Sequence, residues 1–117
     1  MIEEVVITYL NQELTEPVYG SLPKDLPLTF VSVEKTGSYV KDYIVTETLA
    51  IQSWADSQYN AAALNKLVKK TMRGLLNLDC IGKVKLDTDY NYTDTTTKRH
   101  RYQAVYEVVY YEEDLNA

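Results

Sequence analysis

The single histidine is the first place in this sequence to look for catalysis. His100 stands between Arg99 and Arg101. A hydrolytic triad requires a histidine beside a nucleophile and an orienting carboxylate, and neighbouring positive charges lower the basicity of an imidazole. The sequence therefore favours a solvated hairpin histidine, and we expect neither catalytic residues nor enzymatic activity.

Metal and cofactor sites are also disfavoured by the residue types present. One histidine and one cysteine, Cys80, cannot close a zinc site without carboxylates. Asp87 and Asp89 share one face of an extended run and Asp94 follows, but calcium-loop spacing is missing. The four glycines match neither a dinucleotide fingerprint nor a phosphate-binding loop. We expect no metal and no cofactor, with solvated carboxylates on the strand.

One dense basic cluster remains, and it permits two interpretations. It comprises Lys98, Arg99, His100 and Arg101. Such a cluster can contact a phosphate backbone or an acidic surface of a neighbouring subunit. It can equally be a solvated charge run that three aspartates balance across the turn: Asp87, Asp89 and Asp94.

Nucleic-acid binding through this cluster stays open as an alternative. Base stacking needs aromatic rings interleaved with basic groups on an exposed sheet face, and Tyr90, Tyr92 and Tyr102 lie nearby in the sequence. The net charge of −5 works against it, because an acidic chain repels phosphate backbones.

Length and composition indicate one soluble globular domain over residues 1–117. The chain is 45% hydrophobic and 25% charged, which is typical of a folded domain. Eleven tyrosines suit β-strands, and they also suit surfaces that become buried on assembly. A lone cysteine excludes an internal disulfide. The first four residues lack the charge and apolar run of a signal peptide, and no run is long enough to span a membrane, so we expect an intracellular protein.

The apolar periodicity in the first half predicts a helix and then a hairpin. Apolar residues recur at three- and four-residue steps over residues 2–14, and Pro17 ends this helix. Residues 18–21 form a short extended piece before a proline-containing loop. From Leu28 the period becomes two, and turn residues follow at 36–38. A second strand covers residues 43–55, and a connection of several residues, 39–42, is expected at the hairpin tip.

The second half repeats this order with a longer helix. Asp56 or Ser57 can cap a helix that ends near residues 76–77. Residues 81–92 and 101–111 then read as a hairpin with a polar tip at 93–98. Residues 112–117 are expected to be a frayed acidic tail. The predicted fold is α+β in the order α-β-β-α-β-β, with a four-stranded, mainly antiparallel sheet and two helices on one face.

Taken along its whole length, the chain resembles the tail terminator, or tail completion, proteins of long-tailed bacteriophages and prophages. The resemblance starts from the short N-terminal amphipathic helix and continues through five stretches: 17–23 (PVYGSLP), 31–37 (VSVEKTG), 49–55 (LAIQSWA, running into the helix with Ala61, Ala62 and Leu64), 90–94 (YNYTD) and 101–104 (RYQA). It covers nearly the full length, through stretches of modest specificity.

The resemblance implies a structural protein that assembles as a hexameric ring. The ring would cap the head-proximal end of the tail tube, stop tube polymerisation and offer a surface for head joining. Its partners would be further copies of itself, the tail tube protein and the head-completion protein. DNA would pass through the channel without specific binding, and the protein would move from the host cytoplasm into the virion tail.

No motif of functional residues is carried over with the resemblance, so the contact candidates come from the sequence. The first hairpin tip offers Tyr39, Lys41 and Tyr43, and the basic cluster offers the second group; both can also be solvated loops. Two other functions remain: a head-completion or adaptor connector on the other side of the same junction, and a small nucleic-acid-binding α+β domain.

Overall fold

The computed structural model describes residues 2–97 and 99–111. Within them lie two α-helices, one 3-10 helix and five strands. In chain order these are α1 (Ile2–Glu13), β1 (Val18–Tyr19), β2 (Phe30–Lys41), β3 (Ile44–Ala55), α2 (Gln58–Met72), η1 (Arg73–Asn77), β4 (Ile81–Asn91) and β5 (His100–Tyr111).

The five strands form one mixed sheet in the order β1-β2-β3-β5-β4. Strand β1 pairs with β2 in parallel, and the other neighbours are antiparallel. The α+β class and the two hairpins are as the sequence predicts. The expected four-stranded sheet is wrong, because the short extended piece at residues 18–21 supplies a fifth strand.

Side-chain hydrogen bonds explain how so short a segment becomes a strand. The Nδ2 group of Asn11 donates to the Val18 carbonyl over 3.1 Å, and the Val18 amide donates to Asn11 Oδ1 over 3.0 Å. The Val31 amide then donates to the Pro17 carbonyl over 2.9 Å. Helix α1 therefore holds β1 against the edge of β2. Hydrophobic periodicity carries no signal for such a contact.

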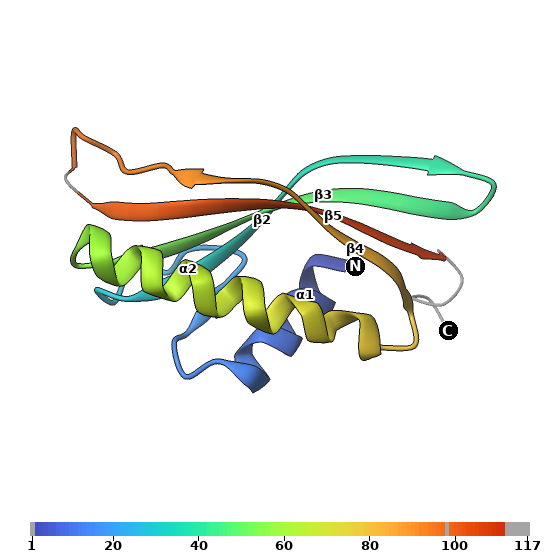
Figure 1. The fold of residues 1–117 in the computed structure, drawn as a ribbon, viewed down its shortest axis with the longest axis horizontal. Coiled ribbons are helices and arrows are strands. Elements are labelled where there is room, and N and C mark those ends of the chain that lie inside the picture. The colour runs from blue at the N-terminus through green and yellow to red at the C-terminus, as the bar shows by residue number, and fades with distance from the viewer. Residues whose placement is uncertain (1, 98, 112–117) are drawn as a thin grey trace.

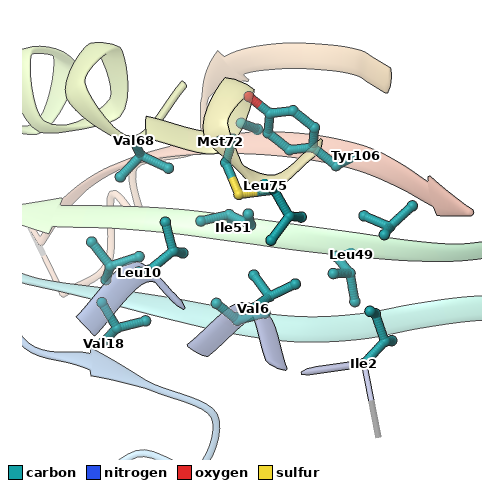
Figure 2. Packing of buried hydrophobic residues seen from close by; sticks show 14 of the residues in the cluster. Ile2, Val6, Leu10, Val18, Leu49, Ile51, Val68, Met72, Leu75 and Tyr106 are labelled. Carbon is teal, nitrogen blue, oxygen red and sulfur yellow. The ribbon is translucent and has the colours of Figure 1, made fainter. Parts of the chain in front are cut away.

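Both helices cover the same face of the sheet (Figure 1). Helix α1 packs on β2, while α2 packs on β3 and β5. The core lies between these layers, and Figure 2 shows Ile2, Val6 and Leu10 of α1 beside Leu49 and Ile51 of β3. The apolar positions predicted over residues 2–14 supply the buried face of α1, and α2 also buries one face against the sheet.

Helix α2 begins and ends close to the predicted positions. The Oγ of Ser57 accepts a hydrogen bond from the Asn60 amide over 3.1 Å and so caps the first turn. The helix ends at Met72 and continues as η1 to Asn77. The Tyr9 hydroxyl donates to the Thr71 carbonyl over 2.8 Å, which joins α1 to this end of α2.

The first hairpin differs from the prediction at its tip. Strands β2 and β3 pair continuously to Lys41 and Ile44, so the expected turn at 36–38 and the expected multi-residue connection at 39–42 are both wrong. The Thr-Gly-Ser stretch is instead part of β2, with a register irregularity between Lys35 and Gly37. A β-bulge accommodates such residues while the flanking backbone groups remain paired.

The register assigns side chains to two opposite faces of the sheet. Val33, Ile51 and Ala104 lie side by side in adjacent strands and belong to the core. Their neighbours one position along each strand therefore point away from the helices. We call that surface the open face; it includes Phe30, Ser32, Gln52, Trp54, Tyr90, Arg101 and Gln103.

Candidate functional site

Two arginines and three aromatic rings form a stack across the open face, at the end of the sheet where β5 begins. Phe30 and Trp54 are stacked with centroids 5.3 Å apart. The Cζ of Arg99 lies 5.5 Å from the Phe30 centroid and 5.7 Å from that of Trp54. The Cζ of Arg101 lies 4.6 Å from Trp54 and 4.4 Å from Tyr92. We call these five residues the arginine–aromatic stack.

Backbone carbonyls hold both guanidinium groups in place. Arg99 donates from an η nitrogen to the Pro27 carbonyl over 3.1 Å, and Arg101 donates from Nε to the Tyr92 carbonyl over 2.7 Å. A guanidinium has five N–H donors, so each arginine retains donors beyond these bonds. Stacking on a ring leaves the planar edge of the group able to accept a bidentate oxyanion.

A row of polar side chains on the open face lies beside the stack. Trp54 Nε1 donates to Ser32 Oγ over 3.2 Å, and that hydroxyl donates to Gln52 Oε1 over 3.3 Å. Gln52 donates to Gln103 over 2.6 Å, and Gln103 donates to the Tyr90 hydroxyl. The row crosses four strands. Its bonds join the stack to the sheet and fix the orientation of the Trp54 ring.

The structure separates the members of the predicted basic cluster. Arg99 and Arg101 meet on the open face, whereas His100 pairs with Ala55 and points to the opposite face. The His100 side chain is partly buried, with Nδ1 buried and unpartnered among the described residues, so a solvated histidine is the wrong description. Lys98 lies outside the described residues.

The aspartates do not balance this cluster as one interpretation supposed. Asp89 forms an ion pair with Lys69 of α2 and accepts a bond from Asn65, and Asp87 lies 3.7 Å from Lys85. Asp94 is closer to the cluster. The pKa of its carboxyl is lowered, first by the Thr96 amide and to a smaller extent by Arg101. Among residues 2–97 and 99–111, no carboxylate lies within 4.0 Å of either arginine.

The nearby tyrosines divide between the two faces. Tyr90 and Tyr92 lie on the open face with their rings edge to face at 5.6 Å, while Tyr102 pairs with Ser53 on the face towards the helices. Phe30 is fully buried and the guanidinium groups cover Trp54. The rings of Phe30 and Trp54 are therefore covered, whereas Tyr90 and Tyr92 remain partly exposed to a stacking base.

The paired ends of β2 and β3 carry exposed apolar side chains, at the other end of the long axis from the stack (Figure 1). We call residues 39–44 the arm tip. Tyr39 is 65% exposed, Val40 57% and Tyr43 69%. Tyr111, which pairs with Ile44, is also exposed. The three predicted contact residues Tyr39, Lys41 and Tyr43 thus lie together at one end of the molecule.

The turn at the arm tip holds two residues in unusual backbone conformations. Asp42 has φ of 53° and Tyr43 has φ of 66°. Two-residue hairpin turns with positive φ at both positions match the twist of the strands, and they favour Asn-Gly or Asp-Gly. A tyrosine in this region carries a steric cost, and such outliers concentrate at functional sites. The turn therefore presents an exposed ring at a position where glycine would be preferred.

Two further features of the molecule are polar groups within largely apolar surroundings. Burial raises the pKa of Tyr106 to about 12; its ring lines a groove of about 350 Å³ with Met72, Leu76, Val84 and Leu86. Glu47 is buried in β3, where it accepts a hydrogen bond from the Tyr110 hydroxyl over 2.8 Å. Desolvation raises the pKa of Glu47, and the nearby negative charge of Glu3 adds to this effect.

Residues 2–97 and 99–111 contain no cluster of side chains suited to holding a metal ion. No group of three or more histidine, cysteine, aspartate or glutamate side chains there could hold a metal ion. Cys80 is half-buried and free. Neither described helix combines the length and the apolarity needed to cross a membrane.

The two arginines can be recognised in the sequence, but the aromatic rings that they contact cannot. Phe30 and Trp54 lie at opposite ends of their strands in the sequence, and only the pairing register brings them together. Val40, Ile44 and Tyr111 were also missed at the arm tip. The length of the strands is the signal that would have predicted their place. When two twelve-residue strands pair along their full length, only residues 42 and 43 are left for the turn.

Comparison with known proteins adds no relative to this description. No protein-family model matches the chain. No curated protein matches it either.

Proposed function

We propose that this protein is a structural subunit that caps the head-proximal end of a phage tail tube as a ring. In this role it ends tube polymerisation and provides the surface to which the head is joined. The proposal starts from the sequence resemblance to tail terminator proteins. The observation that carries it in the structure is the arm tip, with its exposed Tyr39, Val40 and Tyr43.

The arm tip supports an assembly role because its composition is that of a contact surface. Clustered exposed apolar side chains mark protein–protein contacts, and tyrosine is enriched in such interfaces. In β2 most side chains after Val33 are exposed, while the paired strand β3 stays buried as far as Val45, so exposure at this end belongs to β2, the turn and Ile44. A projecting hairpin can reach a neighbouring subunit or the tube protein while the core of its own domain stays intact.

Ring formation follows from a contact between different surfaces of identical subunits. A head-to-tail contact of this kind closes into a ring when its rotation allows. Six weak contacts then strengthen one another, because the last ones form at high effective concentration. No bond is made or broken in this mechanism. An acidic chain with a net charge of −5 suits a channel through which DNA slides without binding.

The two other candidates make different predictions. A head-completion or adaptor protein would occupy the head side of the same junction. A nucleic-acid-binding domain would use Arg99 and Arg101, and their position on an open sheet face favours this function. Coverage of the Trp54 ring by both guanidinium groups and the negative net charge oppose it. Binding of this last kind would weaken steeply with salt, as measured by retention on DNA in rising salt.

The experiment that tests the proposal is deletion of the gene from the phage or prophage that carries it, followed by negative-stain electron microscopy. Overlong or ragged tail tubes beside DNA-filled heads without tails are expected. Tails of normal length with finished head-proximal ends would assign the protein to the head side. Intact infectious particles would remove both assembly functions.

A further inference from the structure

The arginine–aromatic stack contains two positive charges that lack a close counter-ion among residues 2–97 and 99–111. Arg99 and Arg101 are half-buried residues, and the carbonyls of Pro27 and Tyr92 anchor their guanidinium groups on the open face. Among the acids near β4, Asp89 pairs with Lys69 and Asp87 with Lys85. Asp94 accepts a hydrogen bond from the Thr96 amide, and Arg101 is near enough to contribute to the lowered pKa of its carboxyl without forming an ion pair. An arginine pair fixed in this way, with donors unused, is a preformed site for an oxyanion.

We propose that the arginine–aromatic stack binds the carboxylates of residues 112–114 from a second copy of this chain. Glu112, Glu113 and Asp114 are three successive acids directly after β5. A guanidinium and a carboxylate match in charge and in bidentate geometry. The inference deepens the proposed function and rests on it, since it supplies one of the head-to-tail contacts that a ring requires.

Covalent geometry requires this contact to be made between copies. Arg101 and Tyr111 lie ten residues apart on one strand, which at about 3.4 Å per residue separates them by about 34 Å. Three residues beyond Tyr111 extend the chain by at most about 11 Å. The carboxylates of one copy therefore cannot reach the arginines of the same copy. Figure 1 shows β5 running along the long axis, so its first and last residues lie towards opposite ends of the molecule.

A carboxylate ligand fits the stack better than a nucleic acid does. Phe30 is fully buried and the guanidinium groups cover Trp54, so only Tyr90 and Tyr92 offer partly exposed rings to a base. A phosphate backbone would also have to approach a chain with a net charge of −5. A carboxylate needs only the outer edges of the Arg99 and Arg101 guanidinium groups. The chain that would supply it carries more acidic than basic residues.

The only tryptophan of the chain lies beneath both arginines, so its fluorescence reports on the site. The probe is a synthetic peptide with the sequence of residues 112–117, acetylated at its N-terminus and titrated into the full-length protein. We expect a saturable change in Trp54 emission that weakens steeply as salt is raised from about 0.05 to 0.5 M, because exposed charge pairs are screened. The peptide with glutamines and asparagine in place of its acids should give no change.

Variants separate binding by the arginines from a general charge effect. Arg101→Gln should weaken peptide binding about tenfold or more, since it removes a charge-assisted bond. Arg101→Lys keeps the charge but loses the planar guanidinium that can bind a carboxylate through two parallel hydrogen bonds. It should therefore weaken peptide binding less than Arg101→Gln does. Lys83→Gln, an exposed charge elsewhere on β4, is the matched control and should bind as the wild type does. Circular dichroism checks that each variant is folded.

The self-contact is tested on the chain itself by sedimentation velocity over rising protein concentration. The triple variant Glu112→Gln, Glu113→Gln, Asp114→Asn lies outside the described fold and should self-associate more weakly than the wild type. Equal self-association, or an unchanged Trp54 signal with the peptide, would overturn the inference. So would a larger response to a single-stranded oligonucleotide or to inorganic phosphate than to the peptide.

These outcomes are distinct from a failure of the proposed function. If particles lacking the gene have overlong tails but the peptide does not bind, the ring uses other contacts and this inference alone is wrong. If the peptide binds as expected but deletion leaves the tails normal, the self-contact stands and the tail-capping function is wrong.

Discussion

Replacing Glu47 with glutamine is predicted to stabilise the protein at neutral pH. The side chain is 6% exposed, and its Oε2 has no hydrogen-bond partner among the described residues. Burial raises the pKa of this carboxyl and the charge of Glu3 raises it further, against lowering by the Tyr110 hydroxyl and by Lys35. A charged carboxylate at this position therefore costs folding free energy, which an uncharged amide of the same shape avoids.

The pH dependence follows from the direction of this shift. The unfolded chain releases the proton near its ordinary value of 4.5, and the folded chain retains it to higher pH. Between these two values the folded state binds more protons, so stability is fully present below about pH 4.5 and is lost as the pH rises through the folded pKa. Glu47→Gln removes that loss.

The expected size of the effect comes from the buried oxygen. An unsatisfied buried polar group costs about 1–3 kcal/mol. The amide oxygen of glutamine can still accept from the Tyr110 hydroxyl, but its NH₂ group also needs a partner, so we expect a net gain of about 1 kcal/mol at pH 7. For a domain of this size that is a rise of about 4 °C in Tm.

The assay is urea unfolding of the wild type and of Glu47→Gln at several values between pH 4 and pH 8. The two proteins should be equally stable near pH 4 and should separate as the pH rises. Glu34→Gln, on the exposed part of β2, is the matched control and should stay within about 0.5 kcal/mol of the wild type. A wild type more stable than Glu47→Gln at pH 7 would contradict this prediction and would mean that groups around the carboxylate, such as Lys35, compensate the buried charge.

Three further predictions concern the elements that hold the sheet and helices together. Because the pKa of Tyr106 is raised to about 12, the contribution of its neutral hydroxyl to stability should be fully present below about pH 10 and should fall as the pH rises towards 12. Ultraviolet titration of Tyr106→Phe against the wild type checks this, and equal alkaline unfolding of the two proteins would contradict it. Ser57→Ala removes the α2 cap and should cost about 1 kcal/mol in urea unfolding, whereas Ser57→Asp should retain most of the stability. Gly74→Ala places a Cβ against the Tyr9 hydroxyl and should destabilise by about 1–3 kcal/mol; the added Tyr9→Phe change should recover part of that loss, and no recovery would mean that the strain lies elsewhere.

Local patterns in the sequence were sufficient to predict most elements. The apolar stripe of α2 and its Ser57 cap predict the bounds of that helix to within a few residues. This is possible because burial against the sheet imposes a helical period on the apolar positions. Alternation along β5 puts Ala104, Tyr106, Val108 and Tyr110 on one face of the strand, and all four lie in the core. These features depend on neighbours in the chain, so a single sequence contains them.

The features that the sequence did not predict depend on partners far apart in the chain. Strand β1 exists because Asn11 and Val31 bind its backbone, and the bulge near Gly37 depends on its pairing with β3. The arginine–aromatic stack joins residues from four segments through the sheet register. The basic cluster in the sequence pointed to both arginines. It also included His100, but alternation along β5 places that side chain on the other face of the sheet.

Complementation of the deletion tests the capping function and the role of the arm tip together. Particles lacking the gene are supplied with the wild type, with Tyr39→Ser/Tyr43→Ser, or with Tyr59→Ser, which removes an exposed tyrosine of α2 away from the arm. Tail lengths are then measured by negative-stain electron microscopy. We expect overlong tails without the gene and with the arm-tip variant, and normal tails with the wild type and with Tyr59→Ser. Finished tails of normal length in the absence of the gene would contradict the capping function.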